Sequence, residues 1–482
     1  MKQETHPVHL PLRAVIIAGG IGSSILFVLV GVAFRLQLFG DGSIFSYAVA
    51  ARSAWSFHWH NLSGRLFTYL FAYPLAEAVV AMSQNAQAGI TVYGLLFFAA
   101  PLLGLVLTFA VDRTSNRTVF IYACMSTVLL CPLVYGAPTE MWMAHAVFWP
   151  ALALCLSSPV NGRGTAAVFA ALLALVLTHE GAVVLSVGIL FALLLRGWRD
   201  PKFVRAFGVF CATLLIWVAV KALIRPDNYI AGVLATAAFK FIDIRNLVQP
   251  AFLSLWTALT AYVSLIVLWR WMNLPKPHVY AAGACTAALA IYWIWFDDSL
   301  LTEARYNLRT LLLIMIPALG VVASVHAINS AERSGSLFPF VPRLATAIEA
   351  AINPQMAAGA LLLIMLVHAV ETSKFVLAWL DYKSAVRALA TGTASDPQLG
   401  SPLFVSSRRI DAKLNRLAWN STTPYLSVLV TPGLAPTRLV VDPDAGYFWL
   451  TCQTARQSEA TSGVLPASAR QLVRIHACLH RQ

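Results

Sequence analysis

Residues 164–196 read GTAAVFAALLALVLTHEGAVVLSVGILFALLLR, which is two apolar stretches separated by one short polar turn. Before Arg196, the only ionisable residues in this segment are His179 and Glu180. Each stretch approaches the roughly 20 apolar residues that an α-helix needs to cross a bilayer. The pattern therefore predicts a membrane-spanning helical hairpin with Thr178-His179-Glu180-Gly181 at its turn.

The rest of the chain repeats this pattern. Of its 482 residues, 59% are hydrophobic and only 11% are charged, and the mean hydropathy is +0.71. Soluble proteins are about 25% charged, and a single aqueous core stops growing at about 250–300 residues. This composition excludes a soluble enzyme, a disordered chain and a fibrous repeat. We expect an all-α polytopic membrane protein with about eleven transmembrane helices. The expected spans lie near 14–36, 88–110, 118–136, 142–158, 164–178, 181–196, 206–224, 250–269, 279–296, 308–326 and 355–377.

Charge placement predicts the orientation. The net charge is +13, but no folded domain has a clustered basic face, so nucleic acid is not an expected partner. Residues 66–82 are also apolar, and if they crossed, the Arg-rich loop at 196–205 would lie outside, against the positive-inside rule. We therefore interpret 66–82 as a surface helix in a first outer loop spanning 37–87. The N-terminus, interpreted as an uncleaved signal anchor, is then cytoplasmic and the C-terminus lies outside.

Residues 1–377 are thus expected to form the transmembrane domain, and residues 378–482 a small α/β domain outside the membrane. This tail is rich in Pro, Gly and Ser and contains β-type runs YLSVLV, TRLVV and GYFWLTC. Cys452 and Cys478 lie in it without a His/Cys ligand cluster. Outside the cytoplasm such a pair predicts a disulfide and not a metal site.

Ionisable residues gather at the outer ends of the expected spans. They are Asp41, Glu140, His179, Glu180, Asp297, Asp298 and Glu303. Such groups are costly near a bilayer and are functional candidates by default. For Asp41 the alternative is a helix N-cap, and for Glu140 it is a first-turn acid favoured by the helix dipole.

Two further motifs have chemistry suited to phosphate. Arg305 and Arg309 are four residues apart, on one face of a predicted helix, where two guanidinium groups suit bidentate phosphate binding. The alternative is a salt bridge with Glu303 or with the Asp297/Asp298 pair, which can coexist with ligand binding. His179 beside Glu180 suits phosphate binding or proton transfer, and the absence of an HExxH pattern argues against zinc there.

The order of these elements resembles the GT-C superfamily of membrane glycosyltransferases, which use polyprenyl-phosphate sugar donors. The similarity lies in Asp41 after the first span, helices 43–57 and 66–82 in the first outer loop, Glu140 opening the fourth span and the turn 178–181. An ERY-like element at Glu303-Ala304-Arg305-Tyr306 precedes a late span. Two features differ from the family. The family has an Asp-Glu or Asp-Asp doublet after the first span, where this chain has Asp41-Gly42, and the family's lysine in the turn between the fifth and sixth spans is replaced by His179-Glu180.

The resemblance implies roles for the candidate residues. Asp41 is the expected catalytic base, and Glu140 orients the acceptor. The remaining roles are donor-phosphate binding by Arg305, Arg309 and His179, and acceptor-cleft lining by His58, His60, Glu180 and Glu303.

The implied reaction is inverting transfer of a sugar from a polyprenyl-phosphate donor to a lipid, glycan or protein acceptor, at the outer face of a bacterial inner (plasma) membrane. The implied partners are the lipid-linked donor and membrane lipids. No cofactor is expected, and the participation of a divalent cation is left undecided. The alternatives are an O-antigen polymerase or ligase, for which the loop 222–249 is short, a secondary transporter, for which repeated halves are missing, and a non-catalytic membrane protein.

Overall fold

The computed structural model describes residues 10–50, 52, 54, 65–130, 140–223, 250–297, 304–331, 343, 353–393, 404–419, 422–434 and 436–442. These residues are mostly helical. The helices are α1 (Leu10–Phe34), α2 (Asp41–Ala50), α4 (Leu66–Ser83), α5 (Ala86–Val111), α6 (Thr118–Leu130), α7 (Glu140–Ser157), α8 (Gly162–Val176), α9 (Ala182–Leu194), α10 (Pro201–Leu223), α12 (Pro250–Trp271), α13 (Pro277–Trp295), α14 (Ala304–Ala331), α16 (Pro354–Thr391), α17 (Ala412–Asn415) and α18 (Thr423–Leu429). The strands are β1 (Phe404–Ser406) and β2 (Leu439–Val441), and short 3₁₀ turns occur at Leu36–Leu38, Ser115–Arg117, Ser407–Arg409 and Pro432–Leu434.

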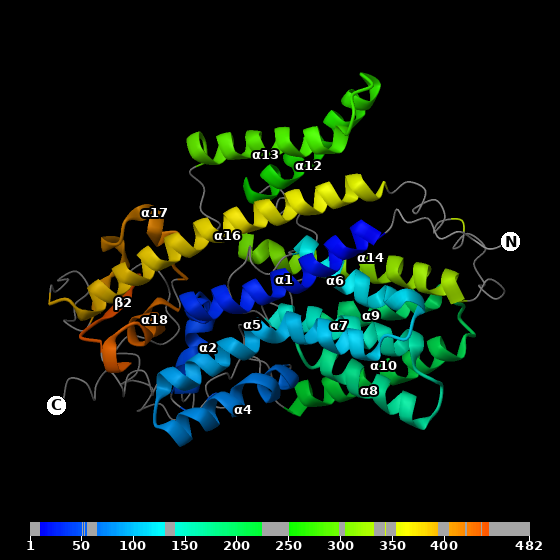
Figure 1. Cartoon of the computed structure of the whole chain (residues 1–482). Coiled ribbons are helices and arrows are strands. Elements are labelled where there is room, and N and C mark those ends of the chain that lie inside the picture. The colour runs from blue at the N-terminus through cyan, green and yellow to red at the C-terminus, as the bar shows by residue number, and fades with distance from the viewer. Residues whose placement is uncertain are drawn as a thin grey trace.

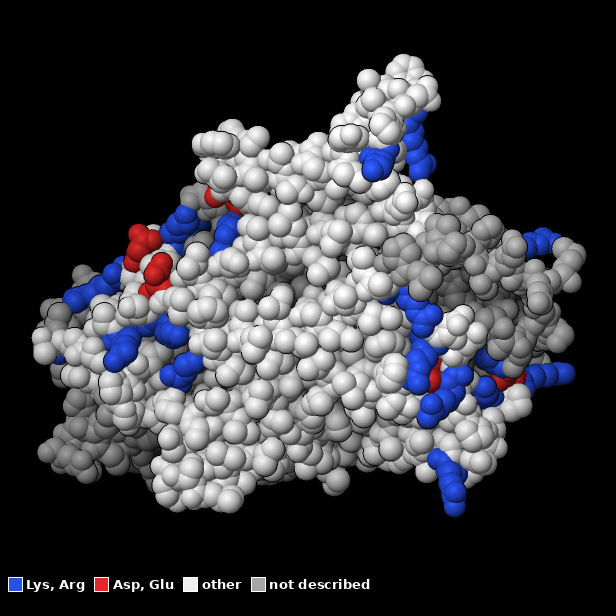
Figure 2. Space-filling model, viewed as in Figure 1, with Lys and Arg blue, Asp and Glu red and all other residues white. Residues whose placement is uncertain are grey.

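Within the described part, seven helices are long and apolar enough to cross a membrane, namely α1, α4, α5, α10, α12, α13 and α16. Helices α8 and α9 and residues 313–328 of α14 are shorter apolar segments. Most of the helices lie side by side along one direction (Figure 1). On the face shown in Figure 2, charged side chains gather toward the two ends and leave a broad uncharged band between them. The protein is therefore a multi-pass helical membrane protein.

Close helix contacts are made where one helix has a small residue. A Cβ added at Gly20 of α1 would lie 2.7 Å from the Cα of Cys124 in α6, and one at Gly104 of α5 would lie 2.6 Å from the Cα of Ala146 in α7. Lipid tails are as apolar as leucine, so helices associate in a membrane largely through van der Waals contact, which small residues allow. These glycines let α1 and α5 approach the central helices α6 and α7.

Helix α7 is enclosed by neighbouring helices along most of its length. Both Trp142 and Trp149 are fully buried in it. The ring of Phe27 in α1 lies 6.3 Å from that of Trp142, which places the first turn of α7 beside Phe27. Phe27 precedes the end of α1 at Phe34 by seven residues. At 1.5 Å per residue, the first turn of α7 therefore lies beside a point on α1 that is roughly 10 Å from the end of that helix.

Helix α4 contains the stretch 66–82 that the sequence analysis assigned to the outer surface. It packs along the first half of α5, with the rings of Tyr73 and Tyr93 5.4 Å apart. A Cβ on Gly89 would meet the Val80 side chain at 2.1 Å. By length and apolarity α4 is also one of the seven candidate spans, so its surface location stays a prediction.

The α12–α13 hairpin lies at one edge of the bundle, at the top of the view in Figure 1, beside α16. Asp297, just after α13, forms an ion pair with Lys374 of α16. The indole N–H of Trp293 donates a hydrogen bond of 3.3 Å to Glu371. These polar contacts fasten the end of α13 to the middle of α16.

The C-terminal region is small and contains two short parallel strands. Phe404, Val405 and Ser406 pair in register with Leu439, Val440 and Val441. The run TRLVV includes β2, as predicted, whereas GYFWLTC lies outside the described residues. Helix α16 continues to Thr391, past the predicted domain boundary at 377.

The strand predicted for YLSVLV, residues 425–430, is wrong. These residues form α18 and its C-cap, with Pro424 in the first turn, where a proline is well tolerated. Every residue of α18 is buried, against α2 and β2 among others. A short apolar run that is buried on all sides shows no period, so its sequence cannot distinguish a strand from a helix.

Candidate functional site

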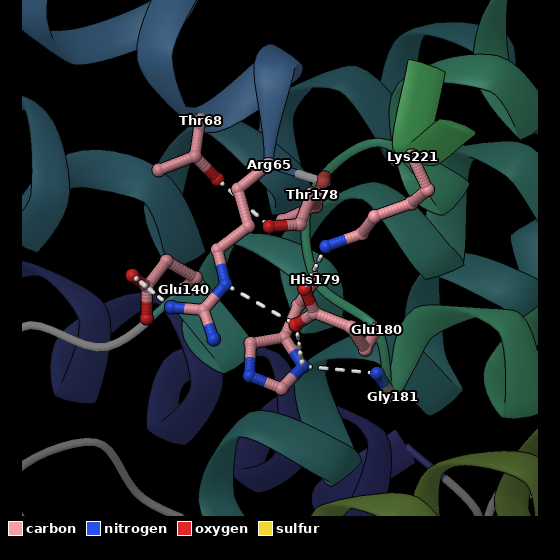
Figure 3. Close-up of polar contacts among 8 residues, drawn as sticks. All are labelled: Arg65, Thr68, Glu140, Thr178, His179, Glu180, Gly181 and Lys221. Carbon is pink, nitrogen blue, oxygen red and sulfur yellow. Dashed lines mark hydrogen bonds and ion pairs between the residues drawn. The ribbon is translucent and has the colours of Figure 1, made fainter. Parts of the chain in front are cut away.

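Four charged side chains form a compact cluster of ion pairs (Figure 3). The guanidinium of Arg65 donates from Nη1 to Oε1 of Glu140 at 2.7 Å and from Nε to Oε2 of Glu180 at 3.2 Å. The Lys221 ammonium donates to Oε1 of Glu180 at 3.0 Å. Arg65 thus bridges two carboxylates, and one of these is shared with Lys221.

The cluster joins segments that are far apart in the chain. Arg65 is the N-cap of α4, Glu140 is the first residue of α7 and Lys221 lies in the last turn of α10. Glu180 lies in the turn between α8 and α9. All of these chain segments therefore meet at one place, beside the first turn of α7.

Backbone contacts also tie the start of α4 to the turn after α8. The N–H of Phe67 donates to the carbonyl of Leu177 at 3.0 Å, and the Thr68 hydroxyl donates to the carbonyl of Thr178 at 3.1 Å. The N–H of Gly181 donates to Nδ1 of His179 at 2.9 Å. Because a backbone N–H only donates, Nδ1 accepts and the proton of a neutral ring lies on Nε2.

The cluster is charged although it is nearly enclosed. The side chains of Arg65 and Glu140 are 12% and 5% exposed, and that of Glu180 is 14% exposed. Burial would raise the pKa of Glu180, but Arg65 and Lys221 outweigh it and hold that pKa well below its ordinary value. Burial would lower the pKa of Arg65, and Glu140 and Glu180 raise it instead. The positive charges of Arg65 and Lys221 balance the negative charges of Glu140 and Glu180, so no buried charge in the cluster is left uncompensated.

Asp41 is the first residue of α2 and is half-buried. It follows Gly40, whose φ of +57° favours glycine at this tight corner. The Ser43 hydroxyl donates to the carbonyl of Thr422 at 3.2 Å, tying this corner to the C-terminal region. The hydroxyl of Tyr93 in α5 lies within electrostatic range of both Asp41 and Glu140. That Asp41 and Glu140 act together stays a prediction.

The other predicted site residues are placed as follows. Arg305 and Arg309 lie in the first turns of α14, and their side chains are outside the described part. Also outside the described residues are His58, His60, Asp298, Glu303, Cys452 and Cys478. Within the part of the chain that the structure describes, no three His, Cys, Asp or Glu side chains gather in a way that suits a metal ion.

The sequence analysis named neither Arg65 nor Lys221. Both are basic residues at helix ends that the charge pattern assigns to the outside, where the positive-inside rule disfavours them. Their predicted place on the outer side is the sequence signal that could have identified them, because a basic residue at an outer helix end indicates an acidic partner nearby. Their partners are Glu140 and Glu180, both of which the sequence did select.

No family model matches the chain, and no curated protein matches it.

Proposed function

We propose that the protein is a membrane glycosyltransferase of the GT-C type, which transfers a sugar from a polyprenyl-phosphate donor to an acceptor hydroxyl. The observation that best supports this is the cluster around Arg65. It joins the middle of the first outer loop, the start of the fourth expected span and the turn between the fifth and sixth, together with Lys221 at the end of α10. The first three are the segments in which the resemblance to the GT-C superfamily lies.

The proposal includes the finer topology. Eleven helices span a bacterial inner membrane, the N-terminus is cytoplasmic, and the C-terminal region with β1 and β2 lies in the periplasm. The donor enters from the outer leaflet, beside the segment that contains Asp41. The half-buried carboxylate there is partly desolvated and so suited to accept a proton.

In the proposed reaction, the Asp41 carboxylate takes the proton of the acceptor hydroxyl as its oxygen attacks the anomeric carbon. The new glycosidic C–O bond forms as the bond from that carbon to the phosphate oxygen breaks. The electron pair leaves with polyprenyl phosphate, and the anomeric configuration inverts. Charge develops on the leaving phosphate, so cationic donors there lower the barrier. Arg305 and Arg309 supply these cationic donors, and His179, in the turn that also contains Glu180, binds the same phosphate.

Arg65 is a positioning residue in this scheme. Its two hydrogen bonds fix Glu140, which orients the acceptor, relative to the turn at His179 and Glu180. Because the cluster is neutral overall, it supplies no net positive charge for the phosphate. The arginines of α14 are therefore needed for that task, and the cluster supplies geometry.

The test is donor turnover by the purified protein in vesicles. A panel of synthetic polyprenyl-phosphate hexoses is offered with membrane extract as the acceptor source, and released polyprenyl phosphate is measured. Asp41→Asn should reduce the release at least about 100-fold, the size of a typical general-base contribution. Full release by the Asp41→Asn protein would refute the mechanism.

The matched control is Asp411→Asn. Asp411 is an exposed N-cap of α17, accepting from the N–H groups of Lys413 and Leu414. Asparagine caps a helix about as well as aspartate. This variant makes the same chemical change away from the site, so it should release polyprenyl phosphate at the wild-type rate.

A further inference from the structure

A hollow of about 550 Å³ lies between the turn that joins α12 to α13 and the start of α16. Its polar lining comes from Arg270, Asn273, Lys276, His278 and Gln355. In Figure 2 blue Lys and Arg atoms flank the tip of the α12–α13 hairpin, at the top of the view. The hollow is thus separate from the cluster around Arg65.

The cations of this hollow have no counter-ion among the described residues. Neither Arg270 nor Lys276 takes part in an ion pair there, and no lining residue is acidic. Asp297, the first acid in the described chain after α12, lies 20 residues beyond Pro277, or roughly 30 Å along the α13 direction. On α16 the first acid is Glu371, which is 16 residues beyond Gln355, or roughly 24 Å. Among the residues that the structure describes, the lining of the hollow is therefore positively charged.

The surroundings match the depth of lipid headgroups. Trp271 is 81% exposed, and the rings of Trp269 and Tyr280 pack edge to face at 6.0 Å. Trp and Tyr concentrate where membrane meets water. Helix α13 also begins at the hollow without a side-chain cap at Lys276, so its N-terminal dipole adds to the positive potential.

We propose that this hollow binds a phosphate group, with the headgroup of an anionic phospholipid as its source. The Arg270 guanidinium offers a planar fork of donors that matches two phosphate oxygens. Lys276 and the His278 ring flank it, and Asn273 and Gln355 add neutral donors. A bound headgroup would connect the α12–α13 turn to the start of α16. This inference is independent of the proposed glycosyl transfer.

The test is native mass spectrometry of the purified protein with phosphatidylglycerol and, separately, with phosphatidylcholine. The variant Arg270→Gln/Lys276→Gln removes both cations while keeping polar side chains. A hydrogen bond to a charged group contributes about 1.5 kcal/mol, so loss of the two cations that contact the phosphate should weaken phosphatidylglycerol binding on the order of 100-fold. The zwitterionic lipid should bind the variant and the wild type equally.

The matched control is Arg163→Gln/Arg199→Gln. Both residues are exposed and lie in loops predicted to be on the same side as the hollow, so the loss of net charge is the same. This control should change phosphatidylglycerol binding less than about 2-fold. The exchange Arg270→Lys/Lys276→Arg keeps both charges and should retain most of the binding.

Equal loss of binding in the variant and the control would overturn the proposal, because general charge would then explain the effect. Binding that survives Arg270→Gln/Lys276→Gln would overturn it as well. Excess inorganic phosphate distinguishes the two sources of the ligand. If it leaves phosphatidylglycerol bound, the site takes a lipid headgroup, and if it displaces the lipid, the same site takes free phosphate.

Discussion

Removal of the central guanidinium of the ion-pair cluster is expected to destabilise the protein strongly. Arg65→Met keeps much of the side-chain volume and leaves Glu140, whose side chain is 5% exposed, without the partner that lies 2.7 Å away. Glu180 keeps Lys221 at 3.0 Å but loses its bond to Arg65. Breaking a buried pair by removing one partner costs about 3–5 kcal/mol. The assay is equilibrium unfolding in micelles at pH 7.

The matched control is Arg199→Met. Arg199 is exposed, and its guanidinium carbon lies 4.3 Å above the ring of Trp198. An exposed cation–π contact contributes about 0.5–1 kcal/mol. The same chemical change should therefore have a several-fold smaller effect at this surface. The double variant Arg65→Met/Glu140→Gln, which also removes the negative charge of Glu140, should recover part of the lost stability.

The pH dependence provides a second test of this cluster. The pKa of Glu180 is held below its ordinary value in the folded protein, chiefly by Arg65 against the opposing effect of burial. A depressed carboxyl pKa contributes stability that is present above the unfolded value of about 4.3 and is lost as the pH falls further. The wild type should therefore lose stability below about pH 4.3, and Arg65→Met should lose less over the same range. If Arg65→Met unfolds within 1 kcal/mol of the wild type, with the same acid dependence, the cluster does not stabilise the fold as argued.

Two further predictions concern helix packing and the tail. Gly20→Ala places a methyl group 2.7 Å from the Cα of Cys124 and should destabilise the protein by about 1–3 kcal/mol. Gly22→Ala, which meets nothing within 4 Å, should not, and equal unfolding of the two variants would contradict this packing. For the tail, thiol titration of the denatured, non-reduced protein should find five of the seven cysteines reactive if Cys452 and Cys478 form a disulfide; seven reactive thiols would refute the pairing.

Much of the helical architecture follows from composition and length alone. Each of the eleven predicted apolar stretches coincides with a helix as far as it is described. This works because an apolar run in a membrane must satisfy all its backbone hydrogen bonds internally, and a helix does so. The error at residues 425–430 is instructive, because a six-residue buried run outside the bundle is under no such requirement. There its neighbours α2 and β2 determine the conformation.

The site was predictable only in its acidic half. Glu140 and Glu180 stand out because carboxylates are rare in so apolar a chain. Arg65 and Lys221 do not stand out in this way, because they are two of 34 basic residues in the chain. Pairing depends on how α4 and α10 pack against α7 and the turn after α8, which no local pattern encodes.

The most direct test of the proposed function is mass spectrometry of the lipids that remain bound to the protein after purification from its native membrane. We expect a polyprenyl phosphate, with or without its sugar, bound to the wild-type protein. The double variant Arg305→Gln/Arg309→Gln should lose that lipid, while Arg163→Gln/Arg199→Gln should keep it. Ordinary phospholipids alone in the wild-type sample, or an isoprenoid lipid retained equally by Arg305→Gln/Arg309→Gln, would contradict the proposed donor site.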